Sequence, residues 1–358
     1  MYGRICSYEN LLVAFKKARK GKTTKDNVIE FENNLSENLQ QLRNELVFHT
    51  YRPRPLRTFI IRDPKTRKIS KSDFRDRIVH HALCNIIEPI FDKSFIFDSY
   101  ANRKGKGTFK AIDRFKYFAR KVSQNYTKTT FVLKADVRHY FETVNHSVLL
   151  SVLRNKIENQ RVMWLIKIIL SNYIMGNNVE GGGVGGIGMP LGNLTSQFFA
   201  NVYLNELDQF VKHILKVRHY IRYVDDFVLL YPSQGYLRNC KDQIKQFLKF
   251  KLKIELHPEK SKIIFLNRGV DFLGLRIFPH HTILRKKNLR KFKRKLEVYS
   301  KEYFGQLIEY DTIYDFLEGW CAHSKNANTY KLRKLVLEQV EKKFPNEVST
   351  KEVNRGLN

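Results

Sequence analysis

The sequence has little cysteine, few acidic residues for its size and no long apolar run. Its four cysteines, Cys6, Cys84, Cys240 and Cys321, show no paired spacing, which argues against a zinc ribbon or a disulfide scaffold and favours a reducing compartment. No apolar stretch approaches the length of a membrane-spanning helix. The first residues become a basic amphipathic segment and lack the apolar core of a signal peptide. We therefore expect a cytoplasmic protein without a membrane partner.

Basic residues are in large excess over acidic ones. The 358 residues contain 65 Lys and Arg against 35 Asp and Glu, which gives a formal net charge of +30. A solvated basic surface or an anionic membrane would also fit this charge. Nucleic acid fits it better, because the acids are placed selectively, no membrane segment is present and neutralised phosphates release counterions.

Three carboxylates are the most informative residues. Asp225 and Asp226 are adjacent and lie between two apolar runs that predict a strand–turn–strand. Adjacent carboxylates repel each other and stabilise no core, whereas hard divalent cations take oxygen ligands and serve nucleotidyl transfer. Asp136 ends a strand-like stretch at residues 130–133. A solvated turn would explain an isolated Asp-Asp pair, but a strand-terminal Asp, a long helix and then an Asp-Asp hairpin favour a metal site.

Apolar periodicity and turn residues predict the order of helices and strands. Helices are expected at residues 8–20, 29–47, 76–91, 236–250 and 285–345, with a long helix after residues 190–197 and another that begins at Asn145. Strands are expected at 59–61 with 67–69 as a hairpin, at 252–256, and at 263–266 paired with 270–277. The glycine-rich patch at 181–188 is expected to be a flexible loop.

These elements, in this order, resemble the reverse transcriptase family over residues 8–335. Asp136 matches the first catalytic motif of that family, and four further segments match a YxDD box (223–226), the motif before it (190–197), a lysine-bearing motif (256–260) and a primer-grip hairpin (270–274). The resemblance implies an α+β right-hand polymerase fold, with fingers, a palm built on an antiparallel sheet, and an α-helical thumb.

The resemblance also implies domain limits. We expect fingers with N-terminal helices at 1–110, a palm at 111–282 with a fingers-side insertion near 145–190, a thumb at 283–345 and a flexible tail at 346–358.

The chemistry implied by the family is attack of a primer 3′-hydroxyl on the α-phosphate of a dNTP. Asp136, Val137, Asp225 and Asp226 would hold two Mg²⁺ ions, for which Mn²⁺ can substitute. Lys260 matches a residue proposed to protonate the departing pyrophosphate, and an ordinary surface lysine is the simpler alternative at this position.

Further positions are carried over from the resemblance. Arg62 and Arg67 would clamp the triphosphate, and Phe141 would exclude a ribose 2′-hydroxyl unless it is only a core residue. Arg75 and Arg77 would serve the structure or the template backbone. The remaining candidates are nucleotide-binding Leu191, Gly192 and Gln197, primer-grip Phe272, Leu273 and Gly274, and nucleic-acid-binding Arg103, Lys104, Lys106, Arg290, Lys291 and Arg294.

One departure sharpens the resemblance. Most reverse transcriptases have glutamine where this chain has Leu191, and the substitution is similar to diversity-generating retroelement reverse transcriptases, as are residues 74–81 and 98–101. That family copies a template RNA with errors opposite adenine, so a template RNA, a primer–cDNA duplex, dNTPs, a structured non-coding RNA and an accessory protein are the expected partners.

Alternatives remain for the biological role. Phage-defence reverse transcriptases share parts of these motifs, and some of them use protein-primed or template-independent synthesis. A non-catalytic RNA-binding scaffold with the same fold would tolerate loss of an aspartate. All three matching positions are aspartates here, which favours an enzyme.

Overall fold

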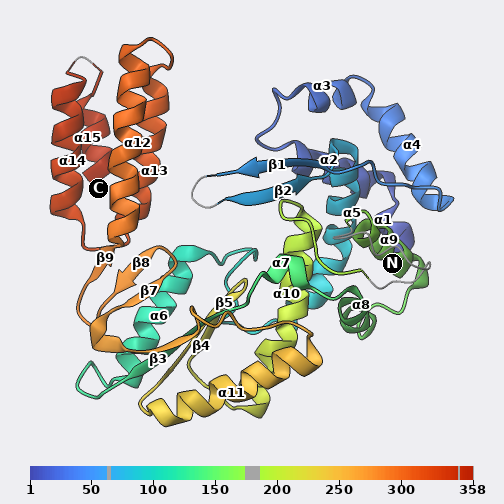
Figure 1. Cartoon of the computed structure of the whole chain (residues 1–358). Coiled ribbons are helices and arrows are strands. Elements are labelled where there is room, and N and C mark those ends of the chain that lie inside the picture. The colour runs from blue at the N-terminus through green and yellow to red at the C-terminus, as the bar shows by residue number, and fades with distance from the viewer. Residues whose placement is uncertain (63–65, 174–185, 346, 358) are drawn as a thin grey trace. The chain divides into compact units, whose positions relative to one another are not determined.

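The computed structural model describes residues 1–62, 66–173, 186–345 and 347–357, which divide into two compact units (Figure 1). The first unit comprises Met1–Gly107, Leu133–Leu229 and Gly235–Lys262, and the second comprises Thr108–Val132, Leu230–Gln234 and Ile263–Asn358. Helices and antiparallel strands are mixed along the chain, as expected for an α+β protein. Among the described residues, none of the helices combines the length and the apolar composition needed to span a bilayer. All four cysteines are buried and free.

The first unit begins with helices that pack on one central helix. The order is α1 (Tyr2–Ile5), α2 (Tyr8–Arg19), α3 (Asp26–Asn33) and α4 (Leu35–Val47), followed later by α5 (Phe74–Asp92). Helix α2 lies along α5 and buries Leu11 and Phe15 there. The single helix expected at 29–47 is wrong, because Asn34 leaves the helical conformation (φ −121°, ψ 47°) and separates α3 from α4.

A hairpin connects this helical group to α5. Strands β1 (Arg57–Ile61) and β2 (Arg67–Lys71) pair antiparallel, with Arg57 opposite Lys71 and Ile61 opposite Arg67, which confirms the predicted hairpin. Every residue of β1 is exposed, whereas Ser70 of β2 is buried.

Further helices of the first unit follow α5 in the chain. They are α8 (His146–Arg154), α9 (Gln160–Ser171), α10 (Leu194–Gln209) and the π-helix η1 (Phe210–Ile214). The side chain of Asn145 accepts a hydrogen bond from the Val148 amide, which confirms the predicted start of α8. Helix α10 is buried on most of its surface and packs against α5. Most of the predicted glycine-rich loop at 181–188 lies outside the described residues.

A four-stranded sheet carries the three aspartates. Its order is β4 (Tyr220–Tyr223), β5 (Asp226–Tyr231), β3 (Phe131–Asp136) and β6 (Lys262–Phe265), and α11 (Gln234–Lys251) follows β5 in the chain. The strand expected at 252–256 is wrong. Lys253 has φ +53°, and the amides of Leu252 and Ile254 both bond to Leu248, so the chain turns off the end of α11 instead of extending.

The second unit joins a small sheet to a helical bundle. Helix α6 (Thr108–Val122) packs Phe115 on Phe272 of the meander β7 (Val270–Phe272), β8 (Leu275–Ile277) and β9 (Thr282–Leu284). Helices α12 (Lys286–Phe304), α13 (Tyr310–Ser324), α14 (Tyr330–Lys343) and α15 (Thr350–Leu357) then lie side by side (Figure 1). Phe292 stacks on Trp320 at the centre of their core, with ring centroids 4.1 Å apart.

Two expectations about this unit are wrong, the first about strand pairing and the second about the C-terminal tail. Residues 263–266 do not pair with 270–277, since β6 joins the sheet of β3 while β7 pairs with β8. The turn between β7 and β8 has positive φ at both Leu273 and Gly274, the backbone that a tight two-residue hairpin requires.

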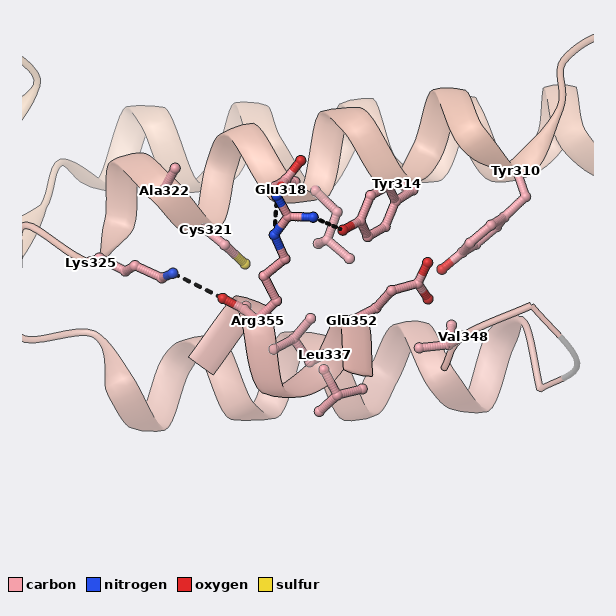
Figure 2. A pocket seen from close by; sticks show the side chains of 13 residues that line it. Tyr310, Tyr314, Glu318, Cys321, Ala322, Lys325, Leu337, Val348, Glu352 and Arg355 are labelled. Carbon is pink, nitrogen blue, oxygen red and sulfur yellow. Dashed lines mark hydrogen bonds and ion pairs between the residues drawn. The ribbon is translucent and has the colours of Figure 1, made fainter. Parts of the chain in front are cut away.

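The predicted flexible tail is also wrong where the structure describes it, because residues 350–357 form α15. Figure 2 shows Arg355 of this helix bonding Glu318 at 2.9 Å and Tyr314 on α13, while Lys325 donates to the Arg355 carbonyl. These groups line a cavity of about 90 Å³ between α13, α14 and α15. Arg333 of α14 donates to the carbonyls of Gly356 and Leu357.

A chain that ends at Ser349 should therefore unfold more easily. We expect a loss of about 1–3 kcal/mol in the free energy of unfolding, because the nearly buried Arg333 loses its two carbonyl acceptors. Denaturant titration measures the loss. Arg333→Met is the control: it should destabilise the full chain and have little further effect in the shortened one. Equal stability of the two chains would mean that α15 does not dock.

Candidate active site

The Asp-Asp hairpin has a strained turn at its tip. Tyr223 pairs with Asp226, so Val224 and Asp225 form a two-residue loop between β4 and β5. Val224 has φ +53°, a conformation that costs a β-branched residue about 1–3 kcal/mol. The sequence prediction that the two aspartates lie at a strand–turn–strand is confirmed, and the strain requires neighbours that hold the turn in place.

Arg222 supplies that support from the strand before the turn. Its guanidinium is fully buried and donates to both carboxylate oxygens of Asp208, at 2.8 and 2.6 Å. It also donates to Asn201, Ser99 and the carbonyl of Val224, the last at 3.0 Å. All five N–H donors of the arginine are thereby used. Burial alone would lower the pKa of Arg222, but Asp208 outweighs it, so the pKa is raised and the side chain stays charged.

Backbone hydrogen bonds of Arg222 also fix β4 to residues 98–100. The Arg222 amide donates to the Asp98 carbonyl and its own carbonyl accepts from Tyr100, so residues 98–100 lie along β4 as a short extra edge. Asn201 of α10 donates in turn to the Ala101 carbonyl. Sequence analysis missed Arg222 and Asp208. The available signal was a charged residue inside the short apolar strand β4, together with an aspartate near the end of the largely buried α10.

The third aspartate meets the turn at the end of β3. The amide next to it, that of Val137, donates to the Asp225 carbonyl at 3.3 Å, and the Asp136 carbonyl accepts from His257 at 2.7 Å. Burial, and after it the negative charges of Asp136 and Asp226, raise the pKa of Asp225 to about 7. The three carboxylates that the sequence predicts therefore do come together.

Their chemistry fits a divalent metal site. Oxygen-only donors that repel one another are stabilised by a hard cation placed between them. No group of three or more His, Cys, Asp or Glu side chains in the described residues already forms a cage for an ion.

Lys260 lies beside this set. Its ammonium group is 2.7 Å from the Asp136 carboxylate, and 49% of its side chain is exposed. An ion pair this open contributes little stability and exchanges easily. Lys260 can therefore leave Asp136 when a cation or a phosphate arrives.

Several residues predicted to bind the nucleotide lie beside β2 or in helices of the first unit. Gly192 has φ +118°, and a Cβ there would lie 2.9 Å from Ile69 of β2, so only glycine fits. The Leu191 carbonyl accepts from the Ser70 amide, and Gln197 lies in the first turn of α10. Phe141, in α7 (Tyr140–Thr143), is half-buried with its ring edge-on to Tyr140.

The remaining predicted residues occupy other places. Arg62 and Arg67 are exposed at the end of the β1–β2 hairpin. Arg103 forms an ion pair with Asp92 and donates to two backbone carbonyls, and its side chain is only 10% exposed. Its contacts therefore stabilise the fold. Lys106 donates to the Phe97 carbonyl and lies over the Phe97 ring, while Lys104 is exposed.

The second unit holds the others. Phe272 is buried and Gly274 accepts a hydrogen bond from Asn288. On α12, Arg290 and Arg294 are exposed and Lys291 is half-exposed.

Known proteins resemble this chain in sequence and in fold. A sheet whose hairpin and neighbouring strand end in three carboxylates, with a helical bundle after it, defines the right-hand polymerase fold. The telomerase of Candida albicans, solved with a fragment of telomeric RNA, matches that fold with a TM-score of 0.51 over 83% of this chain and 57% of its own, at 13% identity.

The family model described as reverse transcriptase (RNA-dependent DNA polymerase) matches residues 62–277, and the chain belongs to that family. It is thereby classed as an RNA-directed DNA polymerase, a nucleotidyltransferase of a family that works with divalent metal ions and RNA templates.

Curated relatives include Protein YkfC of Escherichia coli (strain K12), 29% identical over 71% of this chain and 73% of its own length. The group II intron-encoded protein LtrA of Lactococcus lactis subsp. cremoris is 23% identical over 80% of this chain. The match spans 57% of the length of LtrA.

The Arg222–Asp208 pair makes a prediction that separates stability from positioning. Arg222→Met should cost about 3–5 kcal/mol, because Asp208 is left buried and unpaired. Combining Arg222→Met with Asp208→Leu should recover most of that stability in denaturant titration. DNA synthesis by the double variant should stay about tenfold slow, because the Val224 carbonyl still lacks its charged donor.

Tyr220→Phe is the matched control, since it removes one hydrogen bond to Asp208 without touching the turn. It should lower stability slightly and leave the rate unchanged. A double variant with full activity would show that Arg222 does not position the turn.

Proposed function

We propose that this chain copies RNA into DNA at Asp136, Asp225 and Asp226 with two Mg²⁺ ions. The observation that supports the proposal most directly is the convergence of the three carboxylates, since the Val137 amide donates to the Asp225 carbonyl and, after burial, the charges of Asp136 and Asp226 raise the pKa of Asp225. Backbone hydrogen bonds and the buried Arg222 hold the turn in place, and they keep the three negatively charged carboxylates close together.

The reaction is a displacement at phosphorus. The primer 3′-oxygen forms a new bond to the α-phosphorus of the dNTP, the bond to pyrophosphate breaks, and the hydroxyl proton passes to solvent. When bound, the two ions would stabilise the charge on the attacking and leaving oxygens. The aspartates and the backbone oxygen of Val137 would hold these ions, and Lys260 would give a proton to the departing pyrophosphate.

Substrate selection falls to residues around the aspartates. Phe141 would lie against the sugar and exclude a 2′-hydroxyl, while Arg62 and Arg67 hold the triphosphate through paired donors. Leu191, Gly192 and Gln197 would face the new base pair. At Gly192 only glycine lets the backbone come this close to β2.

The nucleic acid duplex would be held by the second unit and by exposed lysines. Phe272, Leu273 and Gly274 form the tight turn proposed to position the primer end. Arg290, Lys291 and Arg294 present charge along one helix, as a phosphate backbone requires. In the 103–106 turn we assign Lys104 and Lys106 to nucleic acid and Arg103 to the fold.

The first test removes single carboxylates. Asp225→Asn and Asp226→Asn should each reduce magnesium-dependent cDNA synthesis by several orders of magnitude, because a ligand charge is lost at the reacting phosphate. Primer extension on a defined RNA template measures this, and EDTA should abolish wild-type synthesis, with Mn²⁺ able to restore it. Asp242→Asn, which changes an exposed carboxylate of α11, is the control. Full synthesis by both variants would remove the metal assignment.

We further propose that the chain is the error-prone enzyme of a diversity-generating retroelement. Leu191 supports this proposal, because an apolar side chain replaces the glutamine that would contact the incoming nucleotide, and base-pair geometry is then checked less strictly. A template repeat RNA, a structured non-coding RNA and a basic accessory protein would be the partners.

Leu191→Gln should therefore make copying more accurate. We expect misincorporation opposite template adenine to fall several-fold, as measured by sequencing the cDNA. Leu191→Met keeps the apolar character and should keep the wild-type error spectrum. Accurate wild-type copying at adenine would contradict the retroelement role. Synthesis without added template, or on a protein primer, would favour a phage-defence enzyme.

A further inference from the structure

Residues 186–189, hereafter the strap, lie against the segment that carries Phe141, and both belong to the first unit. Three backbone hydrogen bonds join them: from the Met189 amide to the Phe141 carbonyl at 2.6 Å, from the Gly188 amide to the Val144 carbonyl at 2.8 Å, and from the His146 amide to the Gly186 carbonyl at 3.1 Å. The strap is therefore paired with residues 141–146.

The helix that carries Phe141 cannot fix its own position. Helix α7 has only four residues, and so short a helix is not stable by itself in water. One anchor is the buried Tyr140, whose hydroxyl donates to the Ala200 carbonyl of α10 at 2.8 Å. Another is the strap, which binds the Phe141 carbonyl through Met189. The place of the Phe141 ring therefore depends on how firmly the strap is held.

A buried histidine holds the strap. The His146 side chain belongs to a residue that is 3% exposed, and its Nε2 lies 2.6 Å from the Gly188 carbonyl oxygen. Since a carbonyl oxygen only accepts, Nε2 carries the proton and donates it. Burial lowers the pKa of His146, and the bond to Gly188 raises it in part, so the ring is neutral at physiological pH. A neutral ring has a single N–H, and the strap receives it.

The strap approaches α7 closely at Gly188. This residue has φ +93°, and a Cβ there would lie 3.1 Å from the Glu142 carbonyl oxygen and 3.2 Å from the ring of Tyr173. Only glycine takes this backbone without strain and without crowding both neighbours. The next residue, Met189, is 1% exposed. Close packing and the histidine bond together leave the strap little freedom to move.

One peptide group connects His146 to Phe141. The carbonyl that accepts from His146 and the amide that donates to Phe141 belong to the same peptide bond, between Gly188 and Met189. A peptide group is planar, so the two hydrogen bonds fix its orientation together. Hydrogen bonds in such a chain also polarise and strengthen one another. Without the donor of His146, this peptide group would be free to turn, and its hold on Phe141 would loosen.

We propose that His146 is a positioning residue for sugar selection, which acts through the Gly188–Met189 peptide to hold Phe141 where its ring excludes a ribose 2′-hydroxyl. The inference rests on the proposed function, in which Phe141 selects the sugar. Exclusion by contact depends on distance, so a displacement of about 1 Å changes it strongly. His146 itself needs no contact with the nucleotide. Its effect should therefore appear in the choice between two sugars.

The test compares two substitutions of His146 in single-nucleotide primer extension with a dNTP and the matching rNTP. His146→Met keeps a side chain of similar size without the donor. The preference for dNTP, measured as the ratio of the two kcat/KM values, should fall about tenfold through a lower KM for rNTP, since one buried hydrogen bond is lost. His146→Gln places an amide N–H near the position of Nε2 and should keep most of the preference.

Phe141→Ala separates this inference from the sugar selection on which it rests. That variant should lose the preference by itself, and adding His146→Met should then change the ratio no further. If Phe141→Ala keeps the wild-type ratio, the proposed role of Phe141 is wrong. If Phe141→Ala loses the preference while His146→Met keeps it, only the role of His146 is wrong. A purely structural histidine would slow both nucleotides alike in His146→Met and leave their ratio unchanged.

The position of Phe141 can also be followed without catalysis. A trifluoromethyl analogue of phenylalanine at position 141 gives one fluorine NMR resonance. His146→Met should shift or broaden this resonance, whereas His146→Gln and Arg154→Gln, which removes an exposed charge on α8, should keep it in place. Thermal melts check that each variant folds. An unchanged resonance in His146→Met would overturn the inference, while a chain that makes no DNA would contradict the proposed function alone.

Discussion

One buried ion pair carries the geometry of the candidate active site. Arg222 and Asp208 join α10, β4 and residues 98–100, and the same guanidinium holds the carbonyl of the strained Val224. A buried pair of this kind adds little net stability, because desolvation offsets most of the attraction. Its value is specificity. Because all five donors are used, moving the Val224 carbonyl would leave one donor of the buried arginine unpaired, which favours this position of the turn.

That constraint explains how like charges can be held together. Three carboxylates placed at the ends of neighbouring strands would separate if the turn were free to move. The chain opposes this with backbone bonds on both sides, from Val137 to Asp225 and from His257 to Asp136. Burial raises the pKa of Asp225 most and the charges of Asp136 and Asp226 raise it further, while Asp136 forms an ion pair with Lys260. A divalent cation would relieve the repulsion among these carboxylates, as the proposed two-metal site requires.

The sequence predicted the parts whose signal is local. The Asp-Asp hairpin, the end of β3 at Asp136, the β1–β2 hairpin and the Asn145 cap all follow from short patterns and were confirmed. Strand partners could not be predicted in the same way, and β6 joined β3 because pairing depends on distant residues. Arg222 and Asp208 were missed for the same reason, since nothing in the sequence shows that these two charged residues form a pair.

The distribution of the basic residues completes this account. Some cations belong to the fold: Arg222, Arg103 and Arg333 are nearly buried and bonded to carboxylates or carbonyls. Others, such as Lys22, lie near further cations: burial lowers the pKa of Lys22 most, and Arg77 and Lys71 lower it further. Keeping like charges adjacent costs stability unless a partner arrives. The net charge of +30 is therefore unevenly distributed over the protein. Clusters of basic residues indicate where a polyanion is expected to bind.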